Sequence, residues 1–357
     1  MKFFPLFTCS CVLTALFGCA TTTTTRGVSV SDAAVNIEAD AQRDLAVQSI
    51  VEERKRLLRV SRALATKAHS FCGNDLVPST GAVFWSKSKS ELSPSYEKLY
   101  GIAERPTVLF VLDESPAGVA GLQARDVLTQ LNNTAIPNMA GLASVYKTLG
   151  PEDPIRMQVE RDGAPVAIEV RPEKACRYPF VLSTKLAPNA YADGARIVVT
   201  RGMMAFAKDD SELSLVLAHE LAHNVMHHKD AKDQNALGDF FSHMFAAIGS
   251  GGRAWGSTIS STGAGAYSQD FEMEADYVGL YILASSGLPF RDAPRFWRRV
   301  GAAYASNIDT NDTGSHPSFP YRMLALEAAA KEISEKMEQG LPIEPNMKDG
   351  HTALSRR

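Results

Sequence analysis

Apolar residues recur at helical spacing through much of the second half of this chain. The segment Glu212–His228 contains no Gly or Pro, and its apolar residues fall at every fourth position: Leu213, Leu217, Leu221 and Val225. This spacing places them in one stripe on a helix, and side-chain oxygens at positions 209–211 can cap its first turn. Similar patterns predict helices over Ile37–His69, Phe271–Ala284 and Arg322–Gln339.

A second pattern, of β-branched and apolar residues between turn residues, predicts strands nearer the middle of the chain. Pro106–Leu112 is one such run. Ile155–Arg161 and Ala164–Val170 are joined by an Asp-Gly pair, which is a strong signal for a hairpin. A short helix is predicted over Met139–Leu149, and Asn189–Thr200 reads as a turn followed by a strand. The patterns together indicate an α+β fold.

Composition limits the classes of function. With 357 residues and 45% hydrophobic content, the chain is long enough for two cores. A net charge of −3 and the lack of a basic aromatic patch argue against a nucleic-acid partner. Beyond the N-terminus, no apolar run approaches the roughly twenty residues of a membrane span, so none is expected there.

The N-terminus has the form of a targeting segment. Lys2 precedes the apolar stretch Phe3–Phe17, and Gly18-Cys19 follows it. This arrangement resembles the signal of bacterial lipoproteins, which implies a lipid anchor on Cys19 and a periplasm-facing protein of the cell envelope, with the outer membrane favoured. Residues 1–19 would be the signal peptide and residues 20–36 a flexible tether. Ordinary secretion is the alternative.

Export affects how the remaining cysteines are interpreted. Outside the signal region the chain has only Cys72 and Cys176. In an oxidising periplasm two such residues are expected to form a disulfide. Two buried free thiols are the alternative.

The most informative motif is His-Glu-Leu-Ala-His at residues 219–223, on the helix predicted over Glu212–His228. Histidines four residues apart share a helix face, so both rings can reach one Zn²⁺. Glu220 lies beside them, where it can accept a proton from water at the metal. An amphipathic helix that happens to carry two histidines is the alternative. His227 and His228 are expected near the helix C-terminus, where a cation interacts favourably with the dipole, and not on the metal.

A catalytic zinc site needs a third protein ligand and one open position. The next glutamates after the motif open the helix predicted over Phe271–Ala284. There Glu272 and Asp276 share a face, while Glu274 points elsewhere. We therefore expect Glu272 to be the third ligand of one Zn²⁺ per chain, and Asp276 to hold a ligand histidine. The alternative is the acidic first turn of an ordinary helix.

Three segments in order resemble the HtpX-like and BepA-like zinc metallopeptidases, gluzincins related to the CAAX prenyl proteases. They are the histidine motif, the acidic segment 272–276, and His316-Pro317 with Arg322 six residues after the histidine. The resemblance covers about residues 178–330. It implies a mainly helical zincin-type domain with a small sheet.

The same resemblance implies roles for individual residues. His219, His223 and Glu272 would bind zinc, and Glu220 would be the general base and later the proton donor. His316 would approach the metal as an additional ligand or stabilise the tetrahedral intermediate. Arg322 would lie with Asp276 just outside the ligands.

Two further segments have open roles. In the resembling family the strand that matches residues 189–200 lies beside the cleft, and an extended peptide pairs with it; a plain core strand is the alternative. Residues 231–267 are rich in Gly, Ser and Ala and suggest a short helix and a loop. This segment could be a lid, a membrane-touching segment or a loop with neither role.

The strands before the peptidase region resemble the PDZ domains of bacterial periplasmic proteases. The matching pieces are Ser-Pro-Ala at 115–117, Gly-Leu at 121–122 and Asp-Val-Leu at 126–128, while Arg125 and Asn133 stand where that family usually has glycine. Such domains bind peptides by strand addition, and Tyr100-Gly101-Ile102 would belong to the loop that holds a carboxylate. A small β domain that only braces the enzyme is the alternative.

These interpretations divide the chain into a helix of the peptidase domain (37–79), an inserted PDZ-like domain (80–173), a zinc metallopeptidase domain (174–340) and a tail (341–357) expected to be poorly ordered. The expected function is cleavage of extended or misfolded polypeptides, such as poorly assembled outer-membrane proteins. A chaperone-like envelope assembly factor with a latent or structural zinc site is one alternative. A scaffold in which the PDZ-like domain dominates is another.

Overall fold

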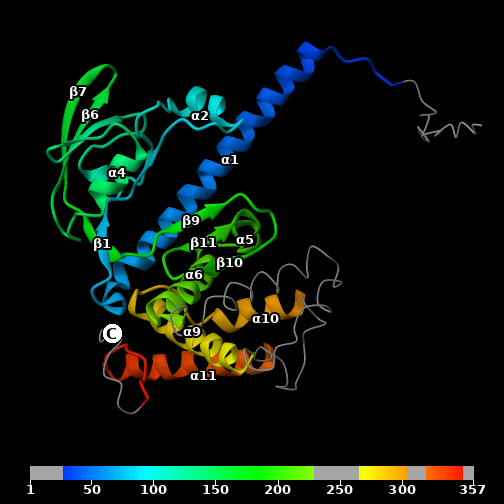
Figure 1. The fold of residues 1–357 in the computed structure, drawn as a ribbon. Coiled ribbons are helices and arrows are strands. Elements are labelled where there is room, and N and C mark those ends of the chain that lie inside the picture. Colours follow the sequence, from blue (N-terminus) through cyan, green and yellow to red (C-terminus); the bar gives the residue numbers. More distant parts are fainter. Residues whose placement is uncertain (1–26, 229–264, 304–318, 349–357) are drawn as a thin grey trace, which may run out of the picture. The chain divides into compact units, whose positions relative to one another are not determined.

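The computed structural model describes residues 27–228, 265–303 and 319–348 (Figure 1). Two compact units are distinguished, residues 1–42 and residues 43–357. In the first unit, the described residues include the start of helix α1 (Asp32–Lys67), which is close to the helix predicted over 37–69. The other described helices and strands belong to the second unit.

A β-rich part follows α1 and a short 3-10 helix, His69–Cys72. Its antiparallel sheet has the order β2-β3-β4-β6-β7, with β5 paired to β4. The bounds are β2 Ala82–Trp85, β3 Thr107–Val111, β4 Val127–Leu131, β5 Thr134–Ala135, β6 Ile155–Arg161 and β7 Ala164–Val170. Helices α2 (Ser93–Tyr100), α3 (Pro116–Val119) and α4 (Met139–Tyr146) lie between the strands in sequence.

The predicted hairpin is confirmed: β6 and β7 pair in register from Ile155↔Val170 to Arg161↔Ala164. Asp162 and Gly163 both have positive φ, at 51° and 80°, as the two central positions of a type I′ turn require. Local sequence therefore fixes this part of the sheet.

The two positions at which the resembling family usually has glycine, Arg125 and Asn133, differ in backbone conformation. Arg125 does adopt a left-handed conformation, with φ 75°. Its guanidinium donates to the Leu99 carbonyl at 3.1 Å, and its side chain lies against Gly101, so the turn is held in place. At the second turn the left-handed residue is Asn132, with φ 53°, and not Asn133.

Helix α1 contributes to two hydrophobic clusters. Val47 and Val51 pack with Leu109 and Phe110 of β3. Other apolar residues of α1, such as Leu64, belong to the large core that also contains the residues of α6 and α9. The long helix thus supplies buried surface to both the β-rich part and the helical part.

Strands β1 (Leu76–Ser79) and β8 (Glu173–Cys176) flank the β-rich part and pair with each other. Cys72 and Cys176 form a disulfide there, with Cα atoms 5.6 Å apart and a sequence separation of 104. The cross-link therefore closes a long loop at the point where the chain enters and leaves the β-rich part.

We expect the double change Cys72→Ala and Cys176→Ala to lower the free energy of unfolding by about 2–4 kcal/mol, because the unfolded chain regains the entropy of an open loop. Urea unfolding with and without dithiothreitol measures this. The reductant should destabilise the native protein and leave the double variant unchanged. A native protein whose stability survives complete reduction, shown by thiol titration, would contradict the prediction.

The helical part contains a second, three-stranded sheet. Its order is β10-β11-β9, with bounds Phe180–Ser183 for β9, Ala190–Ala192 for β10 and Ile197–Thr200 for β11. The helices are α5 (Arg201–Phe206), α6 (Asp210–Val225), α9 (Gly265–Ser285), α10 (Ala293–Ala303) and α11 (Phe319–Glu338). The predicted α+β class, with a mainly helical part and a β-rich part, is confirmed.

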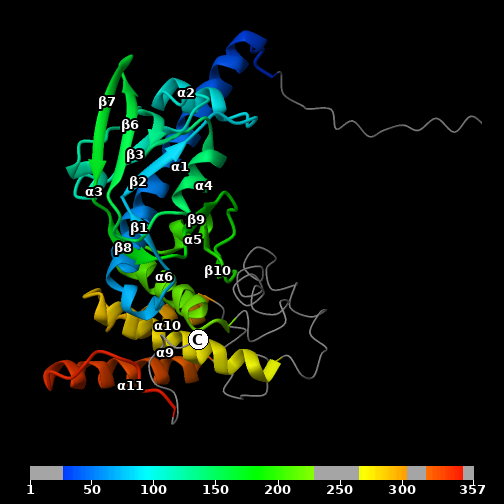
Figure 2. The same cartoon turned by 60° about the vertical axis from the view of Figure 1, so that its left-hand side comes forward.

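Helices α6 and α9 pack closely, and α11 runs alongside α9 (Figure 2). The side chain of Asp209 accepts a hydrogen bond from the Glu212 backbone N–H at 2.8 Å and so caps α6. Gly279 on α9 lies against the backbone of α6: a Cβ there would lie 3.2 Å from the backbone nitrogen of His219. The small residue allows the two helices to approach at the level of the histidine motif.

The residues that follow α11 are better ordered than the sequence suggested. Residues beyond Pro342 were expected to be poorly ordered, but the stretch up to Lys348 is held by hydrogen bonds. The Asn346 backbone N–H donates to the Tyr277 hydroxyl at 3.0 Å, and its side chain donates to Glu332 at 2.9 Å. Among the described residues, no helix combines the length and apolar character that crossing a membrane requires.

Candidate metal centre

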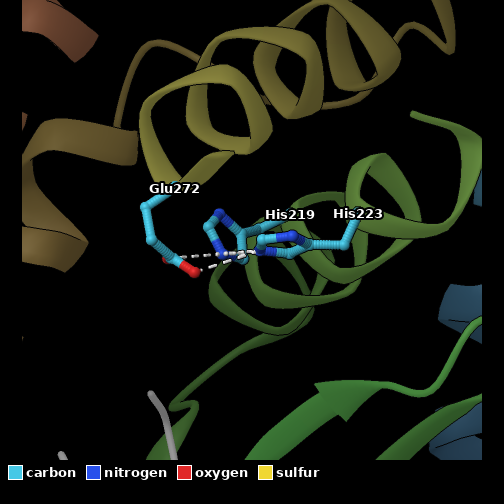
Figure 3. Close-up of side chains that lie close together, drawn as sticks. All are labelled: His219, His223 and Glu272. Atoms are coloured by element: carbon cyan, nitrogen blue, oxygen red, sulfur yellow. Dashed lines mark hydrogen bonds and ion pairs between the residues drawn. The ribbon is translucent and has the colours of Figure 1, made fainter. Parts of the chain in front are cut away.

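Three side chains from two helices converge at one point (Figure 3). His219 and His223 come from α6 and Glu272 from the N-terminal half of α9, and all three are buried. The Nε2 atoms of the histidines are 3.1 Å apart. Each histidine Nε2 lies 3.4 Å from one carboxylate oxygen of Glu272. The structure thus brings together the three residues expected as ligands.

This geometry fits a zinc ion. Zinc bonds to imidazole nitrogen and carboxylate oxygen of about 2.0–2.1 Å in a tetrahedral arrangement place ligand atoms about 3.3 Å apart. The three observed separations lie close to that value. In addition, the buried Oε2 of Glu272 accepts no hydrogen bond, although a buried carboxylate oxygen normally has a partner. A cation between the three residues would satisfy it.

The charges of the site also favour a cation. Burial acts to raise the pKa of Glu272, but His223 and His219 outweigh it and hold that pKa well below its ordinary value. Burial disfavours the charged ring of His219, yet its hydrogen bond with Asp276 and the nearby carboxylate of Glu272 raise its pKa to about 10. The carboxylates therefore attract positive charge to this position.

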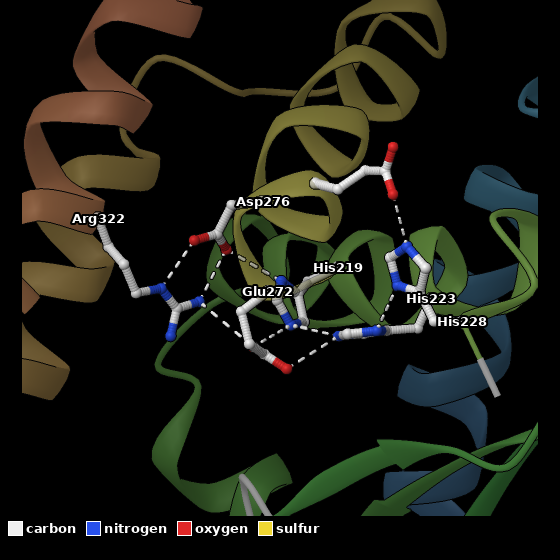
Figure 4. A network of polar contacts seen from close by, with 7 residues as sticks. His219, His223, His228, Glu272, Asp276 and Arg322 are labelled. Atoms are coloured by element: carbon white, nitrogen blue, oxygen red, sulfur yellow. Dashed lines mark hydrogen bonds and ion pairs between the residues drawn. The ribbon is translucent and has the colours of Figure 1, made fainter. Parts of the chain in front are cut away.

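Asp276 and Arg322 form a buried layer behind His219 (Figure 4). The His219 Nδ1 donates to Asp276 Oδ1 at 3.0 Å. Arg322, from α11, donates to both oxygens of Asp276 at 2.7 and 2.8 Å, and its guanidinium stacks 4.5 Å from the ring of Trp297. Asp276 thus fixes the ring of His219 with its Nε2 toward Glu272, as expected from the sequence.

Glu220 is buried beside the three converging side chains and its Oε1 has no hydrogen-bond partner. Burial is the largest cause that raises the pKa of Glu220, to about 7. The backbone of Ala192, at the end of β10, is also hydrogen-bonded to its carboxyl group. A carboxyl group with this pKa can both accept and release a proton near neutral pH.

His228 was wrongly expected to act as a cation at the helix end. Helix α6 ends at Val225, and His228 is buried. Burial lowers its pKa, and its Nδ1 lies 2.9 Å from Nδ1 of His223. Glu274, which was expected to point away from the site, lies 2.9 Å from the other ring nitrogen of His228. Sequence reasoning missed this pair because Glu274 lies on a different face of α9 from Glu272.

Other predicted residues cannot be placed. His316 and Cys19 lie outside the described residues, as does most of the segment 231–267, of which only the start of α9 is described.

Comparisons with known proteins give two families. Residues 154–330 match Peptidase family M48, and residues 80–171 match the PDZ domain. Mitochondrial metalloendopeptidase OMA1 of Schizosaccharomyces pombe is 28% identical over 155 residues, which are 42% of this chain and 46% of the relative. The protein of the same name from Arabidopsis thaliana is 28% identical over 164 residues, 44% of this chain and 32% of the relative. The chain thus spans less than half the length of these relatives.

Among solved structures, the HtrA3 PDZ domain bound to a phage-derived ligand is 17% identical, with a TM-score of 0.22, over 28% of this chain and 88% of that one. The HtrA-type protease AlgW with a decapeptide is 19% identical, with a TM-score of 0.24, over 29% of this chain and 30% of that one.

Proposed function

We propose that the protein is a zinc-dependent endopeptidase, since residues 154–330 match Peptidase family M48 and residues 80–171 match the PDZ domain. The observation that carries the proposal is the convergence of His219, His223 and Glu272 with the buried carboxyl group of Glu220 beside them. Zinc supplies Lewis-acid chemistry at such a site: it polarises the scissile carbonyl and makes water a stronger acid. The names of the two relatives, both metalloendopeptidases, support the same activity.

The protein's own residues account for the proton transfers. Glu220 accepts a proton from the attacking water and delivers it to the leaving amine, for which a pKa of about 7 is well matched. Asp276 keeps the proton of His219 on Nδ1, so that Nε2 remains available as a ligand. Arg322 holds Asp276 in place from the other side.

An extended substrate can pair with β10. Strand β11 lies between β10 and β9, so the edge strand beside Glu220 is β10, and among the described residues no other strand pairs with it. Hydrogen bonds from Thr200 to Asn189 and from Asp193 to Arg196 show that the odd-numbered residues of β10 face β11. The backbone groups of Ala190 and Ala192 therefore point away from β11. One of them, on Ala192, is hydrogen-bonded to Glu220, and a peptide can add as a strand at the others.

Our proposals for the substrates and the location rest on the other parts of the chain. We propose that the PDZ domain recruits extended or misfolded polypeptides, including poorly assembled outer-membrane proteins, by strand addition. The lipoprotein-like segment that ends at Cys19 supports a lipid-anchored protein that faces the periplasm at the outer membrane. Labelling of that cysteine with palmitate tests the anchor. The disulfide between Cys72 and Cys176 is consistent with an oxidising compartment.

Metal removal tests the proposal. We expect the purified protein to contain one zinc per chain and to cleave unfolded casein, because three ligands leave a coordination position open. Treatment with 1,10-phenanthroline should abolish cleavage, and added Zn²⁺ should restore it after the chelator is removed. Cleavage that persists in protein shown by atomic absorption to be free of metal would contradict a metallopeptidase mechanism.

A further inference from the structure

His228 makes contacts that the proposed proton transfers do not use. It follows the C-terminus of α6 and its side chain is 1% exposed. Its ring stacks on Phe271 of α9, with centroids 4.4 Å apart and planes 29° apart. Both ring nitrogens are engaged: Nδ1 lies 2.9 Å from Nδ1 of His223, and Nε2 lies 2.9 Å from a carboxylate oxygen of Glu274.

These contacts determine which nitrogen carries each proton. His223 faces His219 and Glu272 with Nε2, so as a ligand it must carry its proton on Nδ1. That proton needs an acceptor, and in the part of the chain that the structure describes this is an unprotonated Nδ1 of His228. His228 then carries its own proton on Nε2 and donates it to the Glu274 carboxylate, which only accepts.

The two ligand histidines are thus held in parallel ways by two acidic residues of α9. Asp276 accepts directly from His219, whereas Glu274 acts on His223 through the ring of His228. We propose that His228 and Glu274 are positioning residues that orient His223 and fix its tautomer for metal binding. The proposal rests on the proposed function only in assuming that His219, His223 and Glu272 bind zinc.

A purely structural role predicts different behaviour. A histidine that only fills space against Phe271 would be replaced by another aromatic ring without effect on the metal. Fixing of a ligand by a neighbouring acceptor, in contrast, typically contributes about 10–100-fold to metal affinity. The variant His228→Phe separates the two, because it retains a ring that can stack and removes both nitrogens.

The test measures zinc affinity by competition with a chromophoric chelator in the full-length protein. We expect His228→Phe to weaken zinc binding by about 10–100-fold, and Co²⁺ bound in place of zinc to show an altered visible spectrum because His223 is no longer oriented. The matched control is His69→Phe, the same change at a histidine whose ring contacts the Thr66 carbonyl. It should leave both readouts unchanged.

Two milder variants guard against misfolding. His228→Asn places an oxygen near the former Nδ1 and can still accept from His223, so it should recover most of the affinity lost in His228→Phe. Glu274→Gln alters a side chain that is 43% exposed. It should weaken zinc binding because an amide can donate as well as accept, so the proton of His228 is no longer held on Nε2. Circular dichroism of the metal-free variants verifies folding.

The results separate this proposal from the proposed function. If folded His228→Phe and Glu274→Gln bind zinc as tightly as the native protein, the positioning role is wrong, whether or not the protein cleaves peptides. A native protein that binds zinc and cleaves no polypeptide would contradict the peptidase activity, while weakened zinc binding in the variants would still support the role of His228.

Discussion

Replacing Glu220 by glutamine is expected to slow peptide cleavage by about 10²–10⁴-fold, the usual contribution of a general acid–base group, while the bound zinc is retained. Glutamine has nearly the same shape as glutamate but cannot accept the proton of the attacking water. Zinc should stay bound because the ligand atoms belong to His219, His223 and Glu272. Initial rates on unfolded casein, together with the zinc content, measure the two effects separately.

A matched control lies on the same helix. Glu212→Gln makes the same change in the first turn of α6, eight residues before Glu220 and so about 12 Å away along the axis. It removes the charge that pairs with Arg299 and should leave the rate of cleavage nearly unchanged. Equal rates in Glu220→Gln and the native protein would reject Glu220 as the base.

The second large effect is expected at Arg322. Changing it to leucine should lower the free energy of unfolding by about 3–5 kcal/mol, because the substitution leaves a buried carboxylate without its guanidinium partner. Arg322 is 1% exposed and Asp276 is 5% exposed, so water cannot replace the lost hydrogen bonds. Urea unfolding of chelator-treated protein measures the loss without a contribution from zinc binding.

Two further variants test whether the loss of stability arises from the burial of the pair. Adding Asp276→Asn to Arg322→Leu removes the uncompensated charge and should recover part of the lost stability. Arg298→Leu, which removes an exposed pair with Glu327, should cost at most about 1 kcal/mol. Similar losses for Arg298→Leu and Arg322→Leu would mean that the buried pair has no special weight.

Much of the fold follows from local patterns in the sequence. The Asp-Gly hairpin has its predicted bounds because both the alternation of its strands and the turn chemistry act over a few residues. The helix of the histidine motif is close to its predicted bounds for a similar reason: its apolar stripe and its Asp209 cap are local. Helix α10 was not predicted, although its apolar and charged residues alternate with helical periodicity.

Local patterns did not predict the order of the strands in the three-stranded sheet. Residues 189–200 were expected to form a turn and a strand, with its place in the sheet left open. The structure makes Ile197–Thr200 the central strand and Ala190–Ala192 the edge strand. Which strand is central depends on the parallel pairing of β11 with β9, a contact that no local pattern encodes.

The sequence by itself determined the histidine motif, the helices that carry it and the candidate third ligand, because residue type and helical spacing decide which side chains share a face. Only the tertiary structure decided how those faces meet. His219 and Asp276 are 57 residues apart in the chain, and His228 and Glu274 are 46 apart. Their contacts depend on the close packing of α6 against α9, which Gly279 permits and which the burial of both helices stabilises.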